Sequence, residues 1–390
     1  MSKLEELIEQ YCPDGVKYVK LGDFATQWYR GAGIKKDEIA QEGIPCIRYG
    51  EIHTIYKIWF DKCISHTDEA KQPSKKYADY GDILFAITSE DIPFIGNSVA
   101  YMGKDRIMVG GDIVVMKHTQ NPKYISYALS TIDAVSQKGK GKVKSKVVHT
   151  NVPSLKEIVI PVPPLPVQEE IVRILDTFTE LQAELQAELQ KRKQQYNYYR
   201  DNLLSNGGNN AEYLAIPEFA ELKAGKAIKA TELSSIMDEN HSYPCFGGNG
   251  IRGFIKKASH NGDYAIIGRQ GALCGCVNWA SGEFYATEHA VVCTPRFNVS
   301  SRYLYHLFTI ADLNQYKSQG AQPGLSVQRL NELVFPIPSI AEQQRIVSIL
   351  DRFDRLTNDL TSGLPAEIEK RKQQYEYYRD KLLTFKRKGA

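Results

Sequence analysis

Two nearly identical stretches, Lys191–Leu204 (KRKQQYNYYRDNLL) and Lys370–Leu383 (KRKQQYEYYRDKLL), decide how this chain is organised. Twelve of their fourteen residues are the same. A second pair of matched blocks, Pro161–Phe178 and Pro336–Phe353, precedes them, and a tract of helical pattern joins each block to its stretch. The chain is therefore two halves that each end in a long helix. We interpret it as an internally duplicated protein with two similar functional regions. Such a duplication disfavours most enzymes, which need a single asymmetric active site.

The composition is that of an ordinary globular protein. A chain of 390 residues is long enough for two or three domains, and the contents of 42% hydrophobic and 24% charged residues are unexceptional. The net charge of +3 is nearly balanced, so any affinity for nucleic acid must come from local clusters. The amphipathic N-terminus is unlike a signal peptide, no apolar run is long enough to span a membrane, and the seven cysteines include no CxxC pair typical of zinc sites. We predict a cytoplasmic protein with reduced cysteines.

The segments that precede the helical tracts are diverged copies of one another. Residues 12–160 contain short strand-like runs bounded by Gly, Pro or charged residues, and residues 212–335 repeat this plan in weaker form. We call residues 12–160 head 1 and residues 212–335 head 2. Because the heads have diverged while the helical tracts are nearly identical, we expect the two heads to recognise different targets. The matched pairs are Arg30-Gly31 with Ala224-Gly225, Pro45-Cys46 with Pro244-Cys245, Gly81-Asp82 with Gly262-Asp263, and Tyr124 with Tyr303.

The helical tracts carry apolar residues at alternating steps of three and four, which is the seam of a coiled coil. The second tract has one more four-residue step, which we interpret as a stutter, and Thr361–Pro365 should interrupt it. A coiled coil that serves only dimerisation is the alternative, but equal placement after two heads favours an intramolecular pair. The seam residues are Ile171, Ile174, Phe178, Leu181, Leu185, Leu189, Tyr196, Tyr199 and Leu203 in the first tract, and Ile346, Ile349, Phe353, Leu356, Leu360, Leu364, Ile368, Tyr375, Tyr378 and Leu382 in the second.

Over essentially its whole length the chain resembles the DNA-specificity subunit of type I restriction–modification systems. The matched blocks look like the ends of that family's conserved helical regions, and Thr179–Leu189 resembles the tetrapeptide-repeat spacer of one branch. In the second head, Tyr243–Gly253 (YPCFGGNGIRG), Ile267–Ala272 (IGRQGA) and Gln322–Ser326 (QPGLS) are typical of the family. The first head departs from it, with Arg48–Glu51 (RYGE) where the second head is glycine-rich, so its target should differ.

The resemblance implies an α+β fold: two mixed α/β target-recognition domains separated by two long antiparallel coiled-coil helices, in a pseudo-two-fold internal repeat. The recognition domains are residues 1–160 and 206–335, and the conserved helical spacers are residues 161–205 and 336–390. The implied function is non-catalytic recognition of a bipartite DNA target, two half-sites with a fixed unspecified spacer. This chain would hold no metal or cofactor. Two methyltransferase subunits would bring S-adenosylmethionine, and restriction/translocase subunits would bring ATP and magnesium. A single-chain restriction or methyltransferase enzyme is the alternative.

Three weaker motifs are explained better without catalysis. Gly248–Gly253 matches GxGxxG, but no helix pattern opens there, so a glycine-rich turn near a DNA backbone is favoured over a dinucleotide site. Asn121–Tyr124 faintly resembles the Asn-Pro-Pro-Tyr loop of amino-methyltransferases, but its third residue is wrong, and Pro122 suits the first position of a helix. Glu69–Lys71 with a nearby Asp fits a nuclease pattern only by chance, and a solvated loop explains it.

A run of lysines at residues 138–146 (KGKGKVKSK) is the clearest candidate for contact with DNA. Five lysines alternate with other residues, so an extended backbone would place their ammonium groups on one face, where phosphates supply the counter-charge. A solvated loop is the alternative. The other candidates lie near turns of the two heads, and each is also plausible as a plain surface residue. The residues predicted to bind DNA are Arg30, Lys35, Arg48, Tyr49, Lys138, Lys140, Lys142, Lys144, Lys146, Lys226, Lys229, Asn249, Arg252, Arg269, Gln270 and Gln322.

The repeated stretches are expected to bind protein partners rather than DNA. Helical regions that are nearly identical at both ends should meet identical partners, so we assign them to the methyltransferase subunits. The basic residues of these stretches are also compatible with DNA patches, which is the alternative. The residues predicted to bind partners are Lys191, Arg192, Gln195, Tyr198, Tyr199, Lys370, Arg371, Gln374, Tyr377 and Tyr378.

Overall fold

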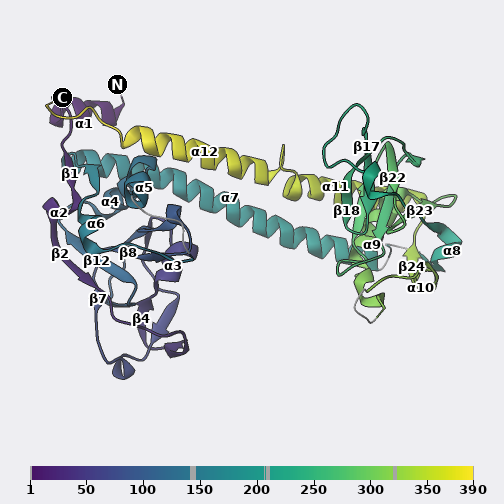
Figure 1. The fold of residues 1–390 in the computed structure, drawn as a ribbon, viewed down its shortest axis with the longest axis horizontal. Coiled ribbons are helices and arrows are strands. Elements are labelled where there is room, and N and C mark those ends of the chain that lie inside the picture. The colour runs from purple at the N-terminus through teal and green to yellow at the C-terminus, as the bar shows by residue number, and fades with distance from the viewer. Residues whose placement is uncertain (1, 141–145, 206, 208–210, 319–322, 390) are drawn as a thin grey trace. The chain divides into compact units, whose positions relative to one another are not determined.

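The computed structural model describes residues 2–140, 146–205, 207, 211–318 and 323–389. The chain divides into two compact units, one of residues 1–184 with 368–390 and the other of residues 185–367. The divisions fall within the helices α7 (Leu165–Ser205) and α12 (Leu364–Leu382). Each unit therefore combines one head with parts of the helical tracts (Figure 1).

Head 1, in the first unit, is built on two five-stranded sheets. The strand orders are β2-β12-β8-β10-β5 and β3-β6-β4-β11-β7, and the pairs β1-β14 and β13-β9 stand apart from them. Apolar residues of both sheets form a shared core that includes Ile47, Leu84, Val99 and Val115. The strands are β1 (Tyr18–Lys20), β2 (Ala25–Arg30), β3 (Ile39–Ala40), β4 (Ile44–Ile47), β5 (Trp59–Phe60), β6 (Ser65–Thr67), β7 (Tyr77–Ala78), β8 (Ile83–Ala86), β9 (Thr88–Ser89), β10 (Ser98–Tyr101), β11 (Ile107–Val109), β12 (Ile113–His118), β13 (Val148–His149) and β14 (Val159–Pro161).

Helices close this head on one side. Tyr124 and Tyr127 of α4 share a second core with Ile171 and Leu175 of α7 and with Tyr375 of α12. Pro122 is the first residue of α4, and the Asn121 side chain accepts a hydrogen bond from the Tyr124 amide, which confirms the predicted helix start. The other elements are α1 (Lys3–Tyr11), α2 (Leu21–Phe24), α3 (Tyr49–Thr54), α4 (Pro122–Leu129), α5 (Ile132–Gly139), α6 (Val152–Lys156), and the 3-10 turns η1 (Lys36–Glu38), η2 (Glu69–Lys71) and η3 (Ile92–Phe94).

Head 2, in the second unit, is a reduced version of the same plan. Two four-stranded sheets have the orders β16-β23-β20-β21 and β18-β17-β22-β19, and β15 pairs with β24. Leu204 of α7 and Ile346 and Leu350 of α11 are buried in its main core. The elements are β15 (Glu212–Ala215), β16 (Ala220–Ala224), β17 (Tyr243–Gly247), β18 (Gly250–Ile255), β19 (His260–Asn261), β20 (Tyr264–Gly268), β21 (Val277–Ala280), β22 (Glu283–Ala286), β23 (Ala290–Pro295), β24 (Val334–Ile337), α8 (Ile216–Phe219), α9 (Ser301–Ile310), α10 (Val327–Asn331), α11 (Ile340–Asn358), η4 (Ala230–Glu232) and η5 (Leu313–Tyr316).

The same hydrogen bonds recur inside each unit, which confirms the internal repeat. In both, a tyrosine hydroxyl and a glutamine amide donate to carbonyl groups of the proline-rich segment that leads into the long helix. A half-buried aspartate of that helix then forms an ion pair with a cation of an earlier helix, α4 in head 1 and α9 in head 2. The matched bonds are Tyr124 to Pro161 (3.0 Å) and Tyr303 to Pro336 (2.9 Å), Gln168 to Pro163 (2.6 Å) and Gln343 to Pro338 (2.8 Å), and Lys123 to Asp176 (2.6 Å) and Arg302 to Asp351 (2.8 Å).

Within the first unit, α7 and α12 run antiparallel, as predicted. The ring of Phe178 stacks on that of Tyr378, with centroids 5.6 Å apart. One turn further along α7, the Gln182 amide donates to the carbonyl oxygen of Arg371 at 3.3 Å. Ascending numbers on α7 thus meet descending numbers on α12 (Figure 1).

The second helical tract is two helices, so the predicted stutter is wrong. Helix α11 ends at Asn358, and α12 begins at Leu364. Leu356 is 38% exposed and Leu360 80% exposed, so neither lies in a seam, and Thr357 is buried instead. The four additional residues are used in a turn rather than in a continuous helix.

Asp359 stabilises this interruption. Its carboxylate accepts hydrogen bonds from the Ser362 hydroxyl, from the Thr361 hydroxyl at 2.6 Å, and from the Thr361 amide at 2.7 Å. These donors hold the pKa of Asp359 well below its usual range. An interruption near Thr361–Pro365 was predicted from the sequence and is confirmed, beginning two residues earlier.

Candidate nucleic-acid interface

The glycine-rich motifs of head 2 meet at one place. Gly248 and Asn249 form the turn between β17 and β18, where Gly247 pairs with Gly250. A Cβ atom on Gly268 would lie 1.9 Å from the carbonyl oxygen of Gly248, and one on Gly248 would lie 2.6 Å from that of Gln270. Only glycine permits backbones to approach so closely. The motifs Tyr243–Gly253 and Ile267–Ala272 are therefore parts of one surface.

A third motif joins them through the backbone. The amide of Gly271 donates to the carbonyl oxygen of Pro323 at 3.0 Å, and Gln270 forms a β-bridge with Gly324. We call residues 247–250, 268–271 and 323–324 the glycine edge of head 2. Sequence motifs separated by up to 77 positions (247 to 324) thus converge on it.

Polar side chains surround the glycine edge and are available to a ligand. Asn249, Arg252 and Gln270 are exposed, and Arg269 is half-buried. Among the described residues, none of these four side chains forms a hydrogen bond or an ion pair. Lys226 is exposed. It lies near the same edge, because its backbone amide donates to the carbonyl oxygen of Ala286 at the end of β22, and β22 pairs with β17. Lys229 is also exposed, and Gln322 lies outside the described residues.

The GxGxxG match is part of this hairpin. Residues 250–255 form β18, not a helix. The φ angle of Gly250 is +83°, and a Cβ there would lie 2.9 Å from Oδ1 of Asn278. A phosphate-binding helix N-terminus is absent at this motif, so the dinucleotide-site alternative is wrong.

Head 1 presents a cleft of about 570 Å³ where head 2 has its glycine edge. Arg48 and Tyr49 line it, as does Glu51, whose side chain is nearly fully buried. Glu51 accepts a hydrogen bond from the Ser65 hydroxyl at 2.6 Å and lies 3.4 Å from Nε of Arg48. Tyr49 is 39% exposed, so its ring offers a stacking surface. The RYGE sequence that distinguishes head 1 therefore forms a wall of this cleft.

The predicted arginines of head 1 are held by carboxylates. Arg30 pairs with Asp112 at 2.7 Å, and Asp112 itself lines the cleft. Arg30 and Arg48 therefore lie in partly neutralised surroundings, in contrast to the arginines of the glycine edge. Lys35 is exposed, but its neighbour Lys36 lines the cleft.

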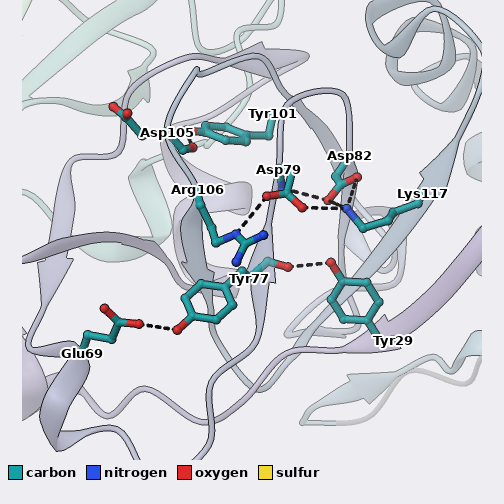
Figure 2. A network of polar contacts seen from close by, with 9 residues as sticks. All are labelled: Tyr29, Glu69, Tyr77, Asp79, Asp82, Tyr101, Asp105, Arg106 and Lys117. Carbon is teal, nitrogen blue, oxygen red and sulfur yellow. Dashed lines mark hydrogen bonds and ion pairs between the residues drawn. The ribbon is translucent and has the colours of Figure 1, made fainter.

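Head 1 also contains a network of ion pairs and hydrogen bonds (Figure 2). Lys117 of β12 lies 3.0 Å from Asp79 and 2.8 Å from Asp82, and Arg106 lies 3.1 Å from Asp79. The Lys117 hydrogen bond lowers the pKa of Asp79, whereas burial raises the pKa of Asp82. The network connects the two sheets, because Lys117 belongs to one and Arg106 leads into β11 of the other. The hydroxyl of Tyr29 on β2 adds a link to the carbonyl of Tyr77 on β7 at 2.5 Å.

The lysine run does not form the predicted extended strip at its start. Lys138 lies in α5, is 7% exposed, and donates from Nζ to the carbonyl oxygen of Leu129 at 2.8 Å. Its burial in a helix removes it from the predicted strip of exposed ammonium groups, so that part of the prediction is wrong. Lys140 and Lys146 are exposed. Lys142 and Lys144 lie outside the described residues, so the prediction for them stays a prediction.

The repeated stretches adopt the same local arrangement in each unit. Tyr198 is 66% exposed and Tyr377 is 61% exposed, whereas their neighbours Tyr199 and Tyr378 each stack on a phenylalanine of the other tract. The guanidinium of Arg192 donates to Gln195 at 2.9 Å, and that of Arg371 donates to Gln374 at 3.1 Å. Lys191 and Lys370 are exposed. Each unit thus offers a similar surface of one projecting tyrosine beside basic and amide side chains.

Several residues of the interface had no sequence signal. Lys36, Asp112 and Ile64 line the head 1 cleft although they come from three separate segments. Cys276 donates from its thiol to the carbonyl oxygen of Gly248 at 3.2 Å and so steadies the glycine edge. These residues lie outside the sequence motifs found at the cleft and the glycine edge, and only the folded structure brings them to these sites.

The family described as type I restriction modification DNA specificity domain matches residues 13–192 and again residues 209–370. The chain belongs to this family. The first match covers head 1 with most of α7, and the second covers head 2 with α11 and the start of α12, as expected for an internal repeat. The predicted family and the predicted α+β fold with two recognition domains are confirmed.

Two relatives and one solved structure give the degree of similarity. The Escherichia coli type I restriction enzyme EcoprrI specificity subunit is 46% identical over 235 residues, which cover 57% of this chain and 59% of the relative. The E. coli EcoR124I/EcoR124II specificity subunit is 35% identical over 291 residues, covering 67% of this chain and 70% of the relative. The S subunit of M. genitalium has a TM-score of 0.58 at 15% identity, over 95% of this chain and 96% of that chain, and so shares the fold. These relatives are named as specificity subunits and give no support to a single-chain restriction or methyltransferase enzyme.

Neither a metal-binding cluster nor a membrane-spanning helix is found in the described part of the chain. No group of three or more His, Cys, Asp or Glu residues is placed there to hold a metal ion. No described helix is long and apolar enough to cross a membrane.

Proposed function

We propose that this chain is the non-catalytic DNA-specificity subunit of a type I restriction–modification complex and that each head reads one half of a bipartite target. The observation that carries the proposal is the double match to the specificity domain on two heads of different surface chemistry. Two diverged heads on repeated helices suit two different half-sites separated by a fixed run of unread bases.

The two heads would use different chemistry. At the glycine edge, Arg252 and Arg269 suit bidentate binding to guanine, and Asn249 and Gln270 suit adenine. The thin glycine backbone allows close approach to the duplex. In head 1, the carboxylates beside Arg30 and Arg48 fix the direction of the guanidinium groups, and Asp112 or Glu51 would repel phosphate and favour base edges with donor groups. Lys226, Lys229, Lys35, Lys140 and Lys146 suit phosphate contacts.

The repeated helix ends would recruit two methyltransferase subunits. Matched surfaces around Tyr198 and Tyr377 favour two copies of one partner, because tyrosine and arginine dominate the binding energy of many protein interfaces. In this proposal S-adenosylmethionine belongs to those subunits, and ATP and magnesium belong to restriction/translocase subunits. The complex acts on DNA in the cytoplasm.

Methyl transfer distinguishes this function from that of a single-chain enzyme. The purified chain, incubated with duplex DNA and labelled S-adenosylmethionine, should transfer no label, because it contributes recognition and not chemistry. Adding the methyltransferase subunit of the same system should produce labelled DNA at one bipartite sequence. Labelling by the chain alone would overturn the proposal.

The exposed lysines of head 1 should contribute affinity that depends on salt but not on sequence. Each neutralised phosphate adds about 0.9 to the slope of log affinity against log salt concentration. Changing Lys140 and Lys146 together to alanine should therefore make the slope shallower by up to about 2 in binding measurements from low to moderate salt. The matched control, Lys386→Ala with Lys388→Ala, removes the same charge from the C-terminal tail and should leave the slope unchanged. Equal slopes for the first variant and the unmodified chain would assign these lysines to solvent.

A further inference from the structure

A cavity of about 290 Å³ lies in head 1, between α3, η3 and α5. Its polar lining includes His53, Lys57, Asn97, Ser98 and Lys138. None of the residues that line it within the described chain is an aspartate or a glutamate. The cavity therefore offers hydrogen-bond donors and positive charge without a carboxylate to balance them.

Lys138 is the group in this cavity that an anion would stabilise most. It is 7% exposed, and its one hydrogen bond among the described residues is the donation from Nζ to the carbonyl oxygen of Leu129. An ammonium group has three donors, and this one forms no ion pair with any described residue. Burial lowers the pKa of Lys138 to about 7, because no nearby negative charge offsets the loss of water. A buried charge that lacks a counter-charge is costly, so a bound anion would lower the free energy of the folded chain.

We propose that this cavity binds a small free oxyanion, a carboxylate or a phosphate or sulfate group, through the ammonium of Lys138. The two remaining donors of Lys138 suit anion oxygens, and the volume is near the lower end for small-ligand pockets. The site does not depend on the proposed DNA-binding function. It is particular to head 1, because Lys317, at the matching place in head 2, is exposed and donates to Asn314 at 2.8 Å.

A helix cap and a DNA phosphate are the two roles that compete with a free anion. Lys138 could serve only to cap α4, since Leu129 is the last residue of that helix and a cation there is favourable. The anion could also be a phosphate of the DNA backbone. A polymer has poor access to an ammonium that is 7% exposed, which favours a small free anion.

The wall of the cavity connects it to the recognition cleft. Helix α3 carries His53 toward the cavity and Tyr49 toward the cleft, and the two rings meet edge to face at 6.1 Å. His53 also lies 2.9 Å from the carbonyl oxygen of Thr88 and 3.4 Å from the Asn97 amide. An anion beside Lys138 would thus lie one helix away from the residues that distinguish head 1.

Calorimetric titration with sodium sulfate tests the site, because sulfate does not itself titrate near neutral pH. The full chain is titrated at pH 7.0 and constant ionic strength, in two buffers of different ionisation enthalpy. We expect one bound sulfate and uptake of part of a proton, because a lysine whose pKa is lowered to about 7 is partly neutral at this pH before it binds. The other titratable groups that line the cavity are His53, Tyr56 and Lys57, and no described acid lines it. If Lys138 takes up the proton, the uptake disappears in Lys138→Met.

Substitutions separate the free anion from the helix cap and from the DNA phosphate. Lys138→Met should abolish sulfate binding, and Lys317→Met, the matched control in head 2, should bind as the unmodified chain does. If Lys138→Met fails to fold, Asn97→Asp supplies an internal carboxylate of nearly the same size and should also abolish binding. Sulfate binding that survives Lys138→Met or Asn97→Asp, or absence of binding to the unmodified chain, would leave Lys138 as a helix cap and overturn the proposal. Competition between short duplex DNA and sulfate would also overturn it, in favour of a backbone phosphate.

Discussion

Replacing residues 12–160 by the matching head of a relative is expected to change one half of the recognised DNA sequence and leave the other half intact. The structural reason is that the heads have separate cores. Head 1 packs around the Ile47 and Tyr124 clusters, and head 2 packs around the Tyr303 cluster. In the described part of the chain, the residues that build the glycine edge all belong to head 2, and those that line the cleft all belong to head 1.

The graft should fold because its contacts with the helices are the repeated ones. Tyr124 and its matched residue Tyr303 bind the same carbonyl position before each long helix. The reciprocal exchange of residues 212–335 is the matched control and should change the opposite half-site. Motifs are read from the methylation pattern of each complex. A single exchange that altered both half-sites, or neither, would contradict separate reading by the two heads.

Duplicating Gln182–Leu185 is expected to lengthen the unread spacer by about one to two base pairs and to preserve both half-sites. Four residues add ~6 Å of helix at ~1.5 Å per residue, and one base-pair step is ~3.4 Å. The insertion rotates the downstream part of the helix by only ~40°, since four residues are close to one 3.6-residue turn. It falls at the end of the first compact unit on α7, at Glu184.

A four-residue insertion elsewhere controls for general damage. Adding Gly-Ser-Gly-Ser after the exposed Ser74, in a bend of head 1, should leave the spacer unchanged. The readout in both cases is the methylated motif. If the helix insertion leaves the spacer as it was, in a complex that still assembles and methylates, α7 does not set the separation of the half-sites.

Local patterns in the sequence predicted the helices well, within limits. The period of apolar residues and the duplication predicted α7 and the seam positions of Phe178 and Tyr378, and the segment Thr361–Pro365, with its glycine and proline, predicted an interruption there. The same period wrongly placed Leu356 and Leu360 in a seam, because spacing alone cannot distinguish a stutter from a turn. The side-chain contacts of Asp359 decide for the turn, and they depend on three-dimensional geometry.

Non-local geometry explains what the sequence missed in the heads. The alternating lysines suggested an extended strip, but helix α5 continues to Gly139 and buries Lys138. The glycine motifs were visible, yet their meeting through Gly248, Gly268 and Gly324 depends on strands that lie far apart in the sequence. The sequence contained even less indication of the cleft in head 1. Asp112 precedes β12 of one sheet, whereas Arg48 follows β4 of the other, and only the fold brings both to the cleft.

The central claim is that one chain reads two separate half-sites through two independent heads. The most direct measurement is a genome-wide map of methylated adenines, by long-read sequencing, in cells that express this chain with its methyltransferase partner. The account predicts one motif of two short specified blocks separated by a run of unspecified bases of constant length. A single uninterrupted motif, or two blocks whose separation varied from site to site, would contradict it.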